Sequence, residues 1–249
     1  MLDLTGTVAL VTGASGGIGR GIALRFAAAG SAVAVHYHRQ ADRAAAVVAE
    51  IEAAGGQAVA LAADLADDGA CHALVRAVVT WGGRLDTLVN NAGIQPVEPL
   101  PEMPVAAWRL MLETNLTSAF SCTQAAAEVM SGGSVIHIAS IEAAQPSPGH
   151  AHYSSAKAAL VMHARNAALE YGARGIRVNT VSPGLIDRPG LAEDWPAGVE
   201  RWRKAAPLGR LGTPADVGNA CVFLASPLAE WITGHNLVVD GGVGSHPTW

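Results

Sequence analysis

Residues 12–19 are Thr-Gly-Ala-Ser-Gly-Gly-Ile-Gly, and they join a short apolar run to an Ala-rich stretch typical of a helix. Glycines at such a turn let the backbone bend tightly and let a pyrophosphate approach it, while the first helical N–H groups attract the anion. The spacing is TGxxxGxG rather than GxGxxG. Its position directly after the first predicted strand indicates a dinucleotide-binding α/β fold. The residues expected to contact the dinucleotide here are Gly13, Ser15, Gly17, Ile18 and Gly19.

Outward from this turn, short β-branched runs alternate with longer helical stretches. The predicted strands are Thr7–Thr12, Ala32–Tyr37, Gln57–Ala62, Thr87–Asn90, Ser134–Ala139, Arg177–Val181 and Asn236–Val239. The predicted helices are Ile18–Ala29, Ala41–Ala54, Asp67–Trp81, Val105–Met130, Tyr153–Tyr171 and Pro214–Ala225. The strands are continuously apolar, which favours a parallel sheet covered on both faces. We therefore expect one α/β domain over residues 1–249, with a Rossmann-like, doubly wound, seven-stranded and mostly parallel sheet flanked by helices.

The stretch from Leu185 to Gly212 interrupts this alternation. It contains three prolines, several glycines, Trp195 and Trp202. An excursion of this length in a compact domain is more often functional than accidental. We expect a substrate lid over about 185–212 that contains short helices.

Composition and charge exclude several functions. The net charge is −5, and no block of lysine or arginine supplies the positive field that binding to nucleic acids or anionic membranes requires. No apolar run reaches the ~18 residues of a membrane span, and the N-terminal residues are not typical of a signal peptide. The cysteines form no disulfide framework and no CxxC metal pair, which indicates buried thiols in a reducing compartment: Cys71, Cys122 and Cys221. These features predict a cytoplasmic protein with a small-molecule partner, no nucleic-acid or membrane partner, and no metal.

The end of the second predicted strand indicates which dinucleotide binds. A carboxylate there would accept hydrogen bonds from a ribose 2′-hydroxyl and repel a 2′-phosphate. This chain has no carboxylate between Val35 and Gln40, and His38 and Arg39 follow the strand instead. A guanidinium matches the geometry of a phosphate. The sequence therefore favours NADP(H) over NAD(H).

Several polar residues lie where an open α/β sheet binds ligands, beyond the carboxyl ends of its strands. Tyr153 and Lys157 are four residues apart, so in a helix their side chains share one face. Ser140 ends the fifth predicted strand, and residues 90–93, Asn-Asn-Ala-Gly, end the fourth. Asn115 lies inside a predicted helix, where asparagine is a poor choice unless its amide has another role. Together they are candidates for one catalytic site.

The chain resembles the short-chain dehydrogenase/reductase family over essentially its full length. TGxxxGxG, NNAG, the mid-helix Asn, the strand-end Ser, YxxxK and a Pro-Gly pair after the sixth strand occur in the family's order. The chain looks like a 3-oxoacyl-ACP reductase-like or carbonyl reductase-like member. The resemblance implies that Tyr153 is the general acid/base and that Ser140 binds the substrate oxygen. It also implies that Lys157 holds the nicotinamide ribose and lowers the pKa of Tyr153, and that Asn115 holds a water in a proton relay through Lys157.

The resemblance assigns further cofactor contacts besides Tyr153 and Lys157. They are Asp64 and Leu65 at the adenine, Asn91, Ala92 and Gly93 along the ribose and central channel, and Pro183, Gly184 and Ile186 at the nicotinamide. Two positions depart from the family pattern. Arg188 stands where the family often has Thr, so it is expected to face the pyrophosphate or the substrate. Gly16 stands where many NADP-dependent members have a basic residue, which weakens the NADP assignment.

The substrate pocket is expected to be both polar and aromatic. Its candidate residues are Gln95, Glu142, Gln145, His150, Leu185, Trp195 and Trp202. Glu142 and Gln95 are placed to hydrogen-bond a hydroxylated or amine-bearing substrate, unless Glu142 is a solvated charge at the rim. His150 and His152 flank Tyr153, and they either line the pocket or lie in the loop at its rim. Sugars, steroids, ketoesters and acyl thioesters all remain open as substrates.

The expected function is reduction of a ketone or aldehyde to an alcohol by hydride transfer from NADP(H), with Tyr153 supplying the proton. One alternative is an NAD-dependent alcohol or polyol dehydrogenase that works oxidatively, in which His38 and Arg39 are idle. Another is a catalytically silent NADP-binding regulator. The intact set of Ser140, Tyr153 and Lys157 argues against the latter.

The family resemblance also implies a homotetramer. Residues 239–244 resemble a strand-end segment that packs near subunit contacts in the family. The last residues, Pro247-Thr248-Trp249, are expected to be either an ordered interface tail or a frayed end.

Overall fold

A computed structural model describes residues 2–245 of the chain. At its centre is one seven-stranded sheet in the order β3-β2-β1-β4-β5-β6-β7. The strands are β1 (Val8–Val11), β2 (Ala32–Tyr37), β3 (Ala58–Ala62), β4 (Thr87–Asn90), β5 (Gly133–Ile138), β6 (Ile176–Pro183) and β7 (Asn236–Val239). Every neighbouring pair is parallel. The predicted Rossmann-like fold is confirmed.

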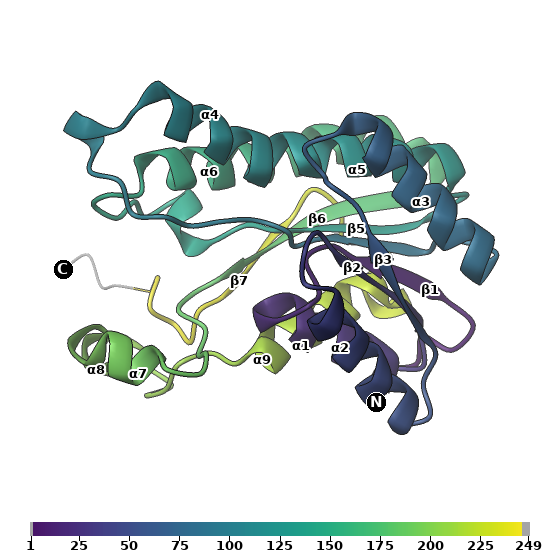
Figure 1. Cartoon of the computed structure of the whole chain (residues 1–249), viewed down its shortest axis with the longest axis horizontal. Coiled ribbons are helices and arrows are strands. Elements are labelled where there is room, and N and C mark those ends of the chain that lie inside the picture. The colour runs from purple at the N-terminus through teal and green to yellow at the C-terminus, as the bar shows by residue number, and fades with distance from the viewer. Residues whose placement is uncertain (1, 246–249) are drawn as a thin grey trace.

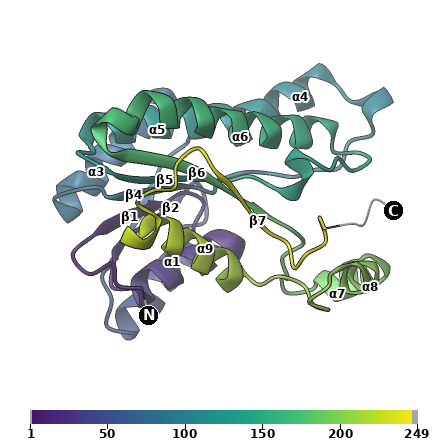
Figure 2. The same ribbon diagram turned by 180° about the vertical axis from the view of Figure 1, so that it is seen from behind.

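Helices cover both faces of this sheet (Figures 1 and 2). One layer consists of α1 (Gly17–Ala28), α2 (Ala41–Ala53) and α9 (Pro214–Ala225). The other consists of α3 (Asp68–Gly82), α4 (Val105–Leu112), α5 (Ser118–Val129) and α6 (Ala151–Tyr171). Short 3-10 turns are η1 (Leu100–Glu102), η3 (Ile141–Ala143), η4 (Gly172–Arg174) and η5 (Pro227–Ala229). Two covered faces are the arrangement that a parallel sheet requires.

The alternation of side chains along each strand builds two cores. In β1, Ala9 and Val11 pack in the core beneath α1, α2 and α9, whereas Val8 and Leu10 pack in the core beneath α3, α5 and α6. Because both faces are buried, the strand is apolar at every position. The cysteines are buried and unpaired, as predicted: Cys71, Cys122 and Cys221.

The strand order reverses between β1 and β4, since β2 and β3 lie on one side of β1 and β4 to β7 on the other. Crossovers leave on opposite faces at such a point, and a crevice opens at the carboxyl ends of the two strands. Val11 ends β1 and Asn90 ends β4. The Gly-rich turn and the NNAG segment therefore both begin at this crevice.

The prediction of one continuous helix over Val105–Met130 is wrong. The structure divides it into α4, a π-helical turn η2 (Glu113–Thr117) and α5. A π turn is rare and occurs frequently at functional sites. Asn115 lies in its middle, so the residue that was ill suited to a helix marks the place where the regular helix is interrupted.

Element bounds follow the predictions closely in the sheet. The bounds of β2, β4 and β7 are those predicted, whereas β6 continues past Val181 to Pro183 because it pairs there with β7. Helix α6 begins at Ala151 instead of Tyr153, and Tyr153 thus lies in its first turn.

The stretch over 185–212 contains the short helices α7 (Leu191–Asp194) and α8 (Pro196–Ala205). A parallel bridge between Ile186 and Gly212 brings the two ends of the stretch together. Figures 1 and 2 show α7 and α8 apart from both helical layers, at the end of the molecule where the described C-terminal segment lies. That segment contacts the stretch directly, because the Leu208 N–H donates to the Gly241 carbonyl over 3.2 Å.

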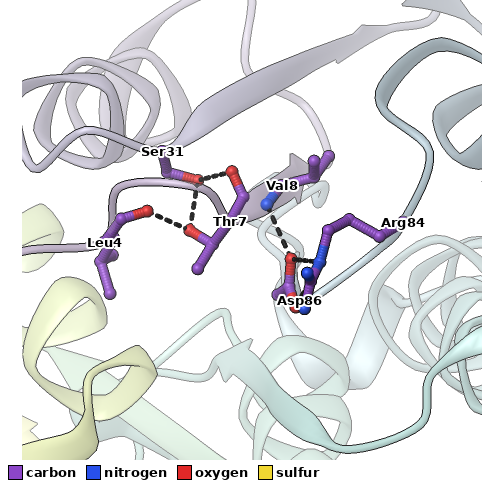
Figure 3. Close-up of polar contacts among 6 residues, drawn as sticks. All are labelled: Leu4, Thr7, Val8, Ser31, Arg84 and Asp86. Carbon is purple, nitrogen blue, oxygen red and sulfur yellow. Dashed lines mark hydrogen bonds and ion pairs between the residues drawn. The ribbon is translucent and has the colours of Figure 1, made fainter.

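Polar contacts close the opposite, amino-terminal edge of the sheet (Figure 3). The Thr7 hydroxyl donates to Ser31 Oγ over 3.1 Å, which joins the starts of β1 and β2. The Asp86 carboxylate accepts the Val8 N–H over 2.9 Å and also pairs with Arg84, which joins the starts of β1 and β4. The edge that carries the crevice is thus left for ligands.

None of the helices within residues 2–245 is both long and apolar enough to cross a membrane. Over the same part of the chain, no group of three or more His, Cys, Asp or Glu side chains is placed to hold a metal ion. The predicted C-terminal tail, Pro247–Trp249, lies outside the described residues.

Candidate active site

The Gly-rich turn between β1 and α1 is shaped to receive an anion. Gly13 and Gly17 have φ of +62° and +51°, a region that favours glycine. A Cβ added at Gly16 or Gly17 would meet nothing within 4 Å, so the space over the turn is open. Gly16 precedes α1 without a side-chain cap, which leaves the first N–H groups of the helix available to a ligand. The pyrophosphate of a dinucleotide fits this cradle.

Thr12 and Asn91 join the turn to the end of β4. The Thr12 hydroxyl oxygen accepts the N–H groups of Asn91 and Ala92 over 2.9 and 3.0 Å. The Asn91 amide donates back to the carbonyls of Thr12 and Gly13 over 2.8 and 3.1 Å. At Gly19, a Cβ would lie 2.3 Å from the Gly13 carbonyl oxygen, so only glycine allows α1 to pack this closely. The Asn91 side chain therefore shapes the cradle from within the protein.

His36, a residue that the sequence analysis did not single out, braces the same turn. Its Nδ1 accepts the Gly13 N–H over 3.0 Å, and its Nε2 lies 3.2 Å from the Ala63 carbonyl. Burial lowers the pKa of His36 to about 4, so the ring is neutral and Nε2 carries the proton. The sequence did offer a signal, because His36 is a polar residue in an otherwise apolar strand, β2, which pairs with the strand that leads into the turn.

The adenosine end of the crevice is polar and exposed. His38 Nε2 lies 3.7 Å from the Asp64 carboxylate, and both side chains are about half exposed. Ser15 donates to the Gln40 side chain over 3.2 Å, which places Gln40, absent from the predicted set, beside the cradle. Arg39, which lies between His38 and Gln40 in the sequence, is exposed. His38 thus lies beside Asp64, and Arg39 is exposed next to it in the sequence; their contact with a 2′-phosphate stays a prediction.

Two of the predicted cofactor residues belong mainly to the core. Ile18 packs against the core beneath α1, α2 and α9. Leu65 packs against the core on the other face. Both are only partly buried, so each keeps a surface that a ligand can contact.

Ser140, Tyr153 and Lys157 come together at the same edge, and all three are buried. Lys157 Nζ lies 5.5 Å from the centre of the Tyr153 ring and donates to the Ile138 carbonyl over 2.7 Å. Ser140 Oγ accepts the Glu142 N–H over 3.1 Å. Because that bond uses the oxygen as an acceptor, the Ser140 hydroxyl proton is available to a substrate oxygen.

The protein's own groups raise the pKa of Tyr153; the lowering that the family resemblance implies, by Lys157 together with the oxidised nicotinamide, stays a prediction. Burial is the main cause, the Glu142 charge adds to it, and the Ser140 hydroxyl opposes it, with a resulting pKa of about 12. Burial also lowers the pKa of Lys157 to about 8. Burial therefore favours the neutral form of both groups.

The side-chain amide of Asn115 hydrogen-bonds the loop after β4. Its Oδ1 accepts the Ile94 N–H and its Nδ2 donates to the Ile94 carbonyl, both over 2.9 Å. A Cβ at Gly93 would lie 2.2 Å from Asn115 Oδ1, which requires glycine there. The Asn115 side chain thus fixes the loop that lies beside Lys157, and the role of Asn115 in holding a water stays a prediction.

The predicted nicotinamide residues lie at the base of the 185–212 stretch. Pro183 ends β6, and the Gly184 N–H donates to the Val239 carbonyl over 3.0 Å. A Cβ at Gly184 would lie 2.7 Å from the Trp202 indole and 3.0 Å from Asp240. Ile186 forms the bridge to Gly212. The Trp202 indole thus packs against the Pro183-Gly184 segment.

The two tryptophans of the predicted lid differ in their surroundings. Trp202 packs with Leu185 in a small core that also contains Leu191, Val199 and Leu211. Trp195 is 46% exposed and covers Gly198, whose Cβ would fall within 2 Å of its indole. Trp202 therefore packs at the base of the stretch beside Gly184, whereas Trp195 lies directly before α8 and is about half exposed.

Arg188 faces neither of its expected partners. Its guanidinium pairs with the Asp194 carboxylate over 2.8 Å, and both side chains are more than half exposed. The pair links the start of the stretch to the end of α7. Asp194, six residues further along the chain, is thus the partner that Arg188 has in this structure.

The polar substrate candidates gather around Glu142. Its carboxylate accepts Gln95 Nε2 over 3.0 Å, His150 Nδ1 over 2.9 Å and Ser154 Oγ over 3.3 Å. Glu142 is 15% exposed in its side chain, which excludes a solvated rim charge. Gln145 lies apart in exposed backbone near Gly244.

His152 is not a rim residue. It is fully buried, and neither ring nitrogen has a hydrogen-bond partner among residues 2–245. Its position in the first turn of α6 turns it into the helical layer, whereas His150, one residue before the helix, stays at the surface of the site. The helix start at Ala151 is what separates the two.

Comparisons with known proteins agree with this geometry. Residues 13–244 match the family model described as enoyl-(acyl carrier protein) reductase. The 3-oxoacyl-[acyl-carrier-protein] reductase of Synechocystis sp. is 40% identical over 247 residues, which cover 98% of this chain and 99% of that protein. A short-chain dehydrogenase from Burkholderia cenocepacia J2315, solved in complex with NADP, has a TM-score of 0.91 and 37% identity, with 97% of this chain and 99% of that chain covered.

A 7α-hydroxysteroid dehydrogenase, complexed with NADH and 7-oxo glycochenodeoxycholic acid, has a TM-score of 0.91 and 38% identity, with 96% and 95% of the two chains covered. The chain belongs to the short-chain dehydrogenase/reductase family of oxidoreductases.

Replacing Lys157 by Met should show the cost of burying its charge. The unfolded chain binds the lysine proton up to its ordinary pKa of 10.5, whereas the folded chain releases it at about 8. The wild type should therefore gain stability relative to Lys157→Met as pH rises through that window, by at most about 1.4 kcal/mol per pH unit. Unfolding free energies from denaturant titrations at pH 7 to 10 measure the difference. Exposed Lys204 provides the control, since Lys204→Met should give a difference that does not change with pH; a constant difference for Lys157→Met would contradict the buried-charge assignment.

Proposed function

We propose that this protein is an NADP(H)-dependent reductase that converts a ketone or aldehyde to an alcohol. The observation that carries the proposal is the gathering of the buried side chains of Ser140, Tyr153 and Lys157 at the edge of the sheet that also carries the Gly-rich cradle. Burial raises the pKa of Tyr153, so the phenol is protonated at neutral pH. A protonated phenol is the form that donates a proton to a carbonyl oxygen during reduction.

The chain's own groups divide the work as follows. Bound NADPH would supply a hydride. The Gly13–Gly19 cradle would hold one end of the cofactor, and Lys157 would hold it near the other end. Ser140 donates a hydrogen bond to the carbonyl oxygen and stabilises the negative charge that develops on it. Tyr153 donates its proton to the same oxygen, and the Lys157 ammonium stabilises the phenolate that remains. Trp202, packed on Gly184, limits access of water from the side of the 185–212 stretch.

The relatives support a carbonyl substrate. The Synechocystis protein is named for reduction of a 3-oxoacyl group, and the steroid dehydrogenase was solved with a 7-oxo compound. Both compounds are ketones. The oxidative, NAD-dependent alternative would need His38 and Arg39 to be idle, although no carboxylate between Val35 and Gln40 would repel a 2′-phosphate. The silent-regulator alternative gives no reason for Ser140, Tyr153 and Lys157 to be buried together.

Tyr153→Phe should abolish turnover and leave the cofactor bound. Phenylalanine keeps the ring but removes the proton donor, so kcat with NADPH and a reactive ketone should fall by about a hundredfold or more. Nicotinamide fluorescence should give an unchanged Kd for NADPH. Tyr171→Phe, at the other end of α6, is the matched control and should be fully active. Substantial activity in Tyr153→Phe would exclude Tyr153 as the acid.

Arg39→Ala should weaken NADPH selectively. His38 and Arg39 follow β2, and no carboxylate of that segment opposes a 2′-phosphate. Loss of a charge-assisted hydrogen bond should weaken the binding free energy of NADPH by about 1–3 kcal/mol, which raises its Kd. The Kd for NADH should stay unchanged. Arg84→Ala, at the opposite edge of the sheet, serves as the control (Figure 3). Equal weakening of both cofactors would mean that Arg39 does not bind the 2′-phosphate.

We also propose that the protein is a homotetramer. Apolar side chains are exposed on α5 and α6, at Phe120, Met162 and Leu169, and near the edge strand β7, where Trp231 is 97% exposed. Large exposed apolar side chains of this kind suit subunit contacts. Sedimentation equilibrium should give four times the chain mass of 25.4 kDa. A single-chain mass at micromolar concentration would overturn the proposal.

A further inference from the structure

The pair of Glu142 and His150 stands directly beside the proposed acid. His150 Nδ1 lies 2.9 and 3.1 Å from the two carboxylate oxygens of Glu142. The His150 ring meets the Tyr153 ring edge to face, with 6.1 Å between the ring centres. Both members are largely buried, with 16% and 15% of their side chains exposed. In the chemistry described for Ser140, Tyr153 and Lys157, the Glu142 charge acts only on the pKa of Tyr153, and His150 has no role.

The Glu142 carboxylate is already occupied. Three donors, from Gln95, His150 and Ser154, point at its two oxygens. These donors come from the loop after β4, the segment before α6 and α6 itself. Glu142 therefore holds neighbouring groups in place, and little of its acceptor capacity remains for a substrate.

This occupancy determines the state of His150. A carboxylate only accepts hydrogen bonds, so the His150 Nδ1 must carry a proton. In the neutral ring, Nε2 is then an acceptor with a lone pair, as in other carboxylate–histidine pairs. Within residues 2–245, Nε2 has no hydrogen-bond partner and is not among the polar atoms sealed from solvent. His150 Nε2 is therefore a hydrogen-bond acceptor on the ring that packs against Tyr153, and no protein donor bonds to it within residues 2–245.

We propose that His150 is a specificity residue: its Nε2 accepts a hydrogen bond from a hydroxyl group that the substrate carries close to its carbonyl. The inference rests on the proposed reductase function and adds a substrate class to it, namely hydroxyketones and related hydroxylated carbonyl compounds. With the carbonyl oxygen held by Ser140 and Tyr153, a hydroxyl a bond or two away reaches the ring that packs on Tyr153. An unhydroxylated ketone would exclude solvent from Nε2 without replacing it by a donor, which costs binding energy.

The test compares ketones that differ only in one hydroxyl. Three pairs cover different sizes: 2-butanone and 1-hydroxy-2-butanone, cyclohexanone and 2-hydroxycyclohexanone, acetophenone and 2-hydroxyacetophenone. The wild type should reduce the hydroxylated member of at least one pair with a kcat/KM about tenfold higher, as expected for one buried hydrogen bond. In His150→Phe this preference should disappear, while kcat/KM for the plain ketone changes by less than about threefold. NADPH binding should stay unchanged.

Two further variants make the result specific. Glu142→Gln removes the charge that fixes the Nδ1 proton and should reduce the preference without loss of the imidazole, so it tests the same point if His150→Phe does not fold. His72→Phe makes the same substitution in a His–Glu pair on the surface, where His72 Nδ1 lies 3.2 Å from Glu128, and should preserve the preference.

The other outcomes separate the two proposals. A preference that persists in His150→Phe, or a wild type that reduces both members of each pair equally, would overturn the role of His150 and leave the reductase function intact. An equal loss on both members would show that His150 only supports Tyr153, which also overturns the substrate contact. A wild type that binds NADPH but reduces no member of any pair would count against the reductase function, and the hydroxyketone class would fall with it.

Discussion

The interlocked hydrogen bonds of Thr12 and Asn91 join the carboxyl ends of β1 and β4, and the candidate site depends on that join. It fixes the Gly-rich turn at the place where the strand order reverses, the point where a parallel sheet opens a crevice. His36 braces the turn from β2, and Gly19 lets α1 approach it. On the other side of the join, the NNAG segment leads to the loop that Asn115 holds. Cofactor cradle and catalytic groups are thus neighbours because two strands are neighbours.

Burial is the common cause of the site's electrostatics. The same desolvation raises the pKa of Tyr153, lowers that of Lys157 and keeps His36 neutral. Burial thus favours the neutral form of each of these groups, which include a phenol that can donate a proton and a ring that accepts a backbone N–H. The pair of Glu142 and His150 follows the same rule, because a carboxylate filled by protein donors fixes which ring nitrogen carries the proton.

The sheet was predictable because burial on both faces makes each strand a continuous apolar run, and β2, β4 and β7 have their predicted bounds. The candidate catalytic residues were predictable as a set because Ser140 and NNAG stand at the carboxyl ends of β5 and β4, and YxxxK places Tyr153 and Lys157 on one face of α6. The π turn was not, since the sequence over Val105–Met130 has helical periodicity throughout and only the pairing of Asn115 with Ile94 interrupts it. The contrast between His150 and His152 was equally hidden, because it depends on where α6 begins. The direction of the Tyr153 pKa shift depends on burial, which spacing does not show.

The most direct measurement is the pair of dissociation constants of the wild-type protein for NADPH and NADH, from nicotinamide fluorescence at one ionic strength. A cradle at the strand reversal, with His38 and Arg39 at its adenosine end, predicts binding of both and a Kd for NADPH lower by about tenfold or more, equal to about 1.4 kcal/mol. An equal or lower Kd for NADH would contradict the 2′-phosphate site, and binding of neither would contradict the assignment of the crevice to a dinucleotide.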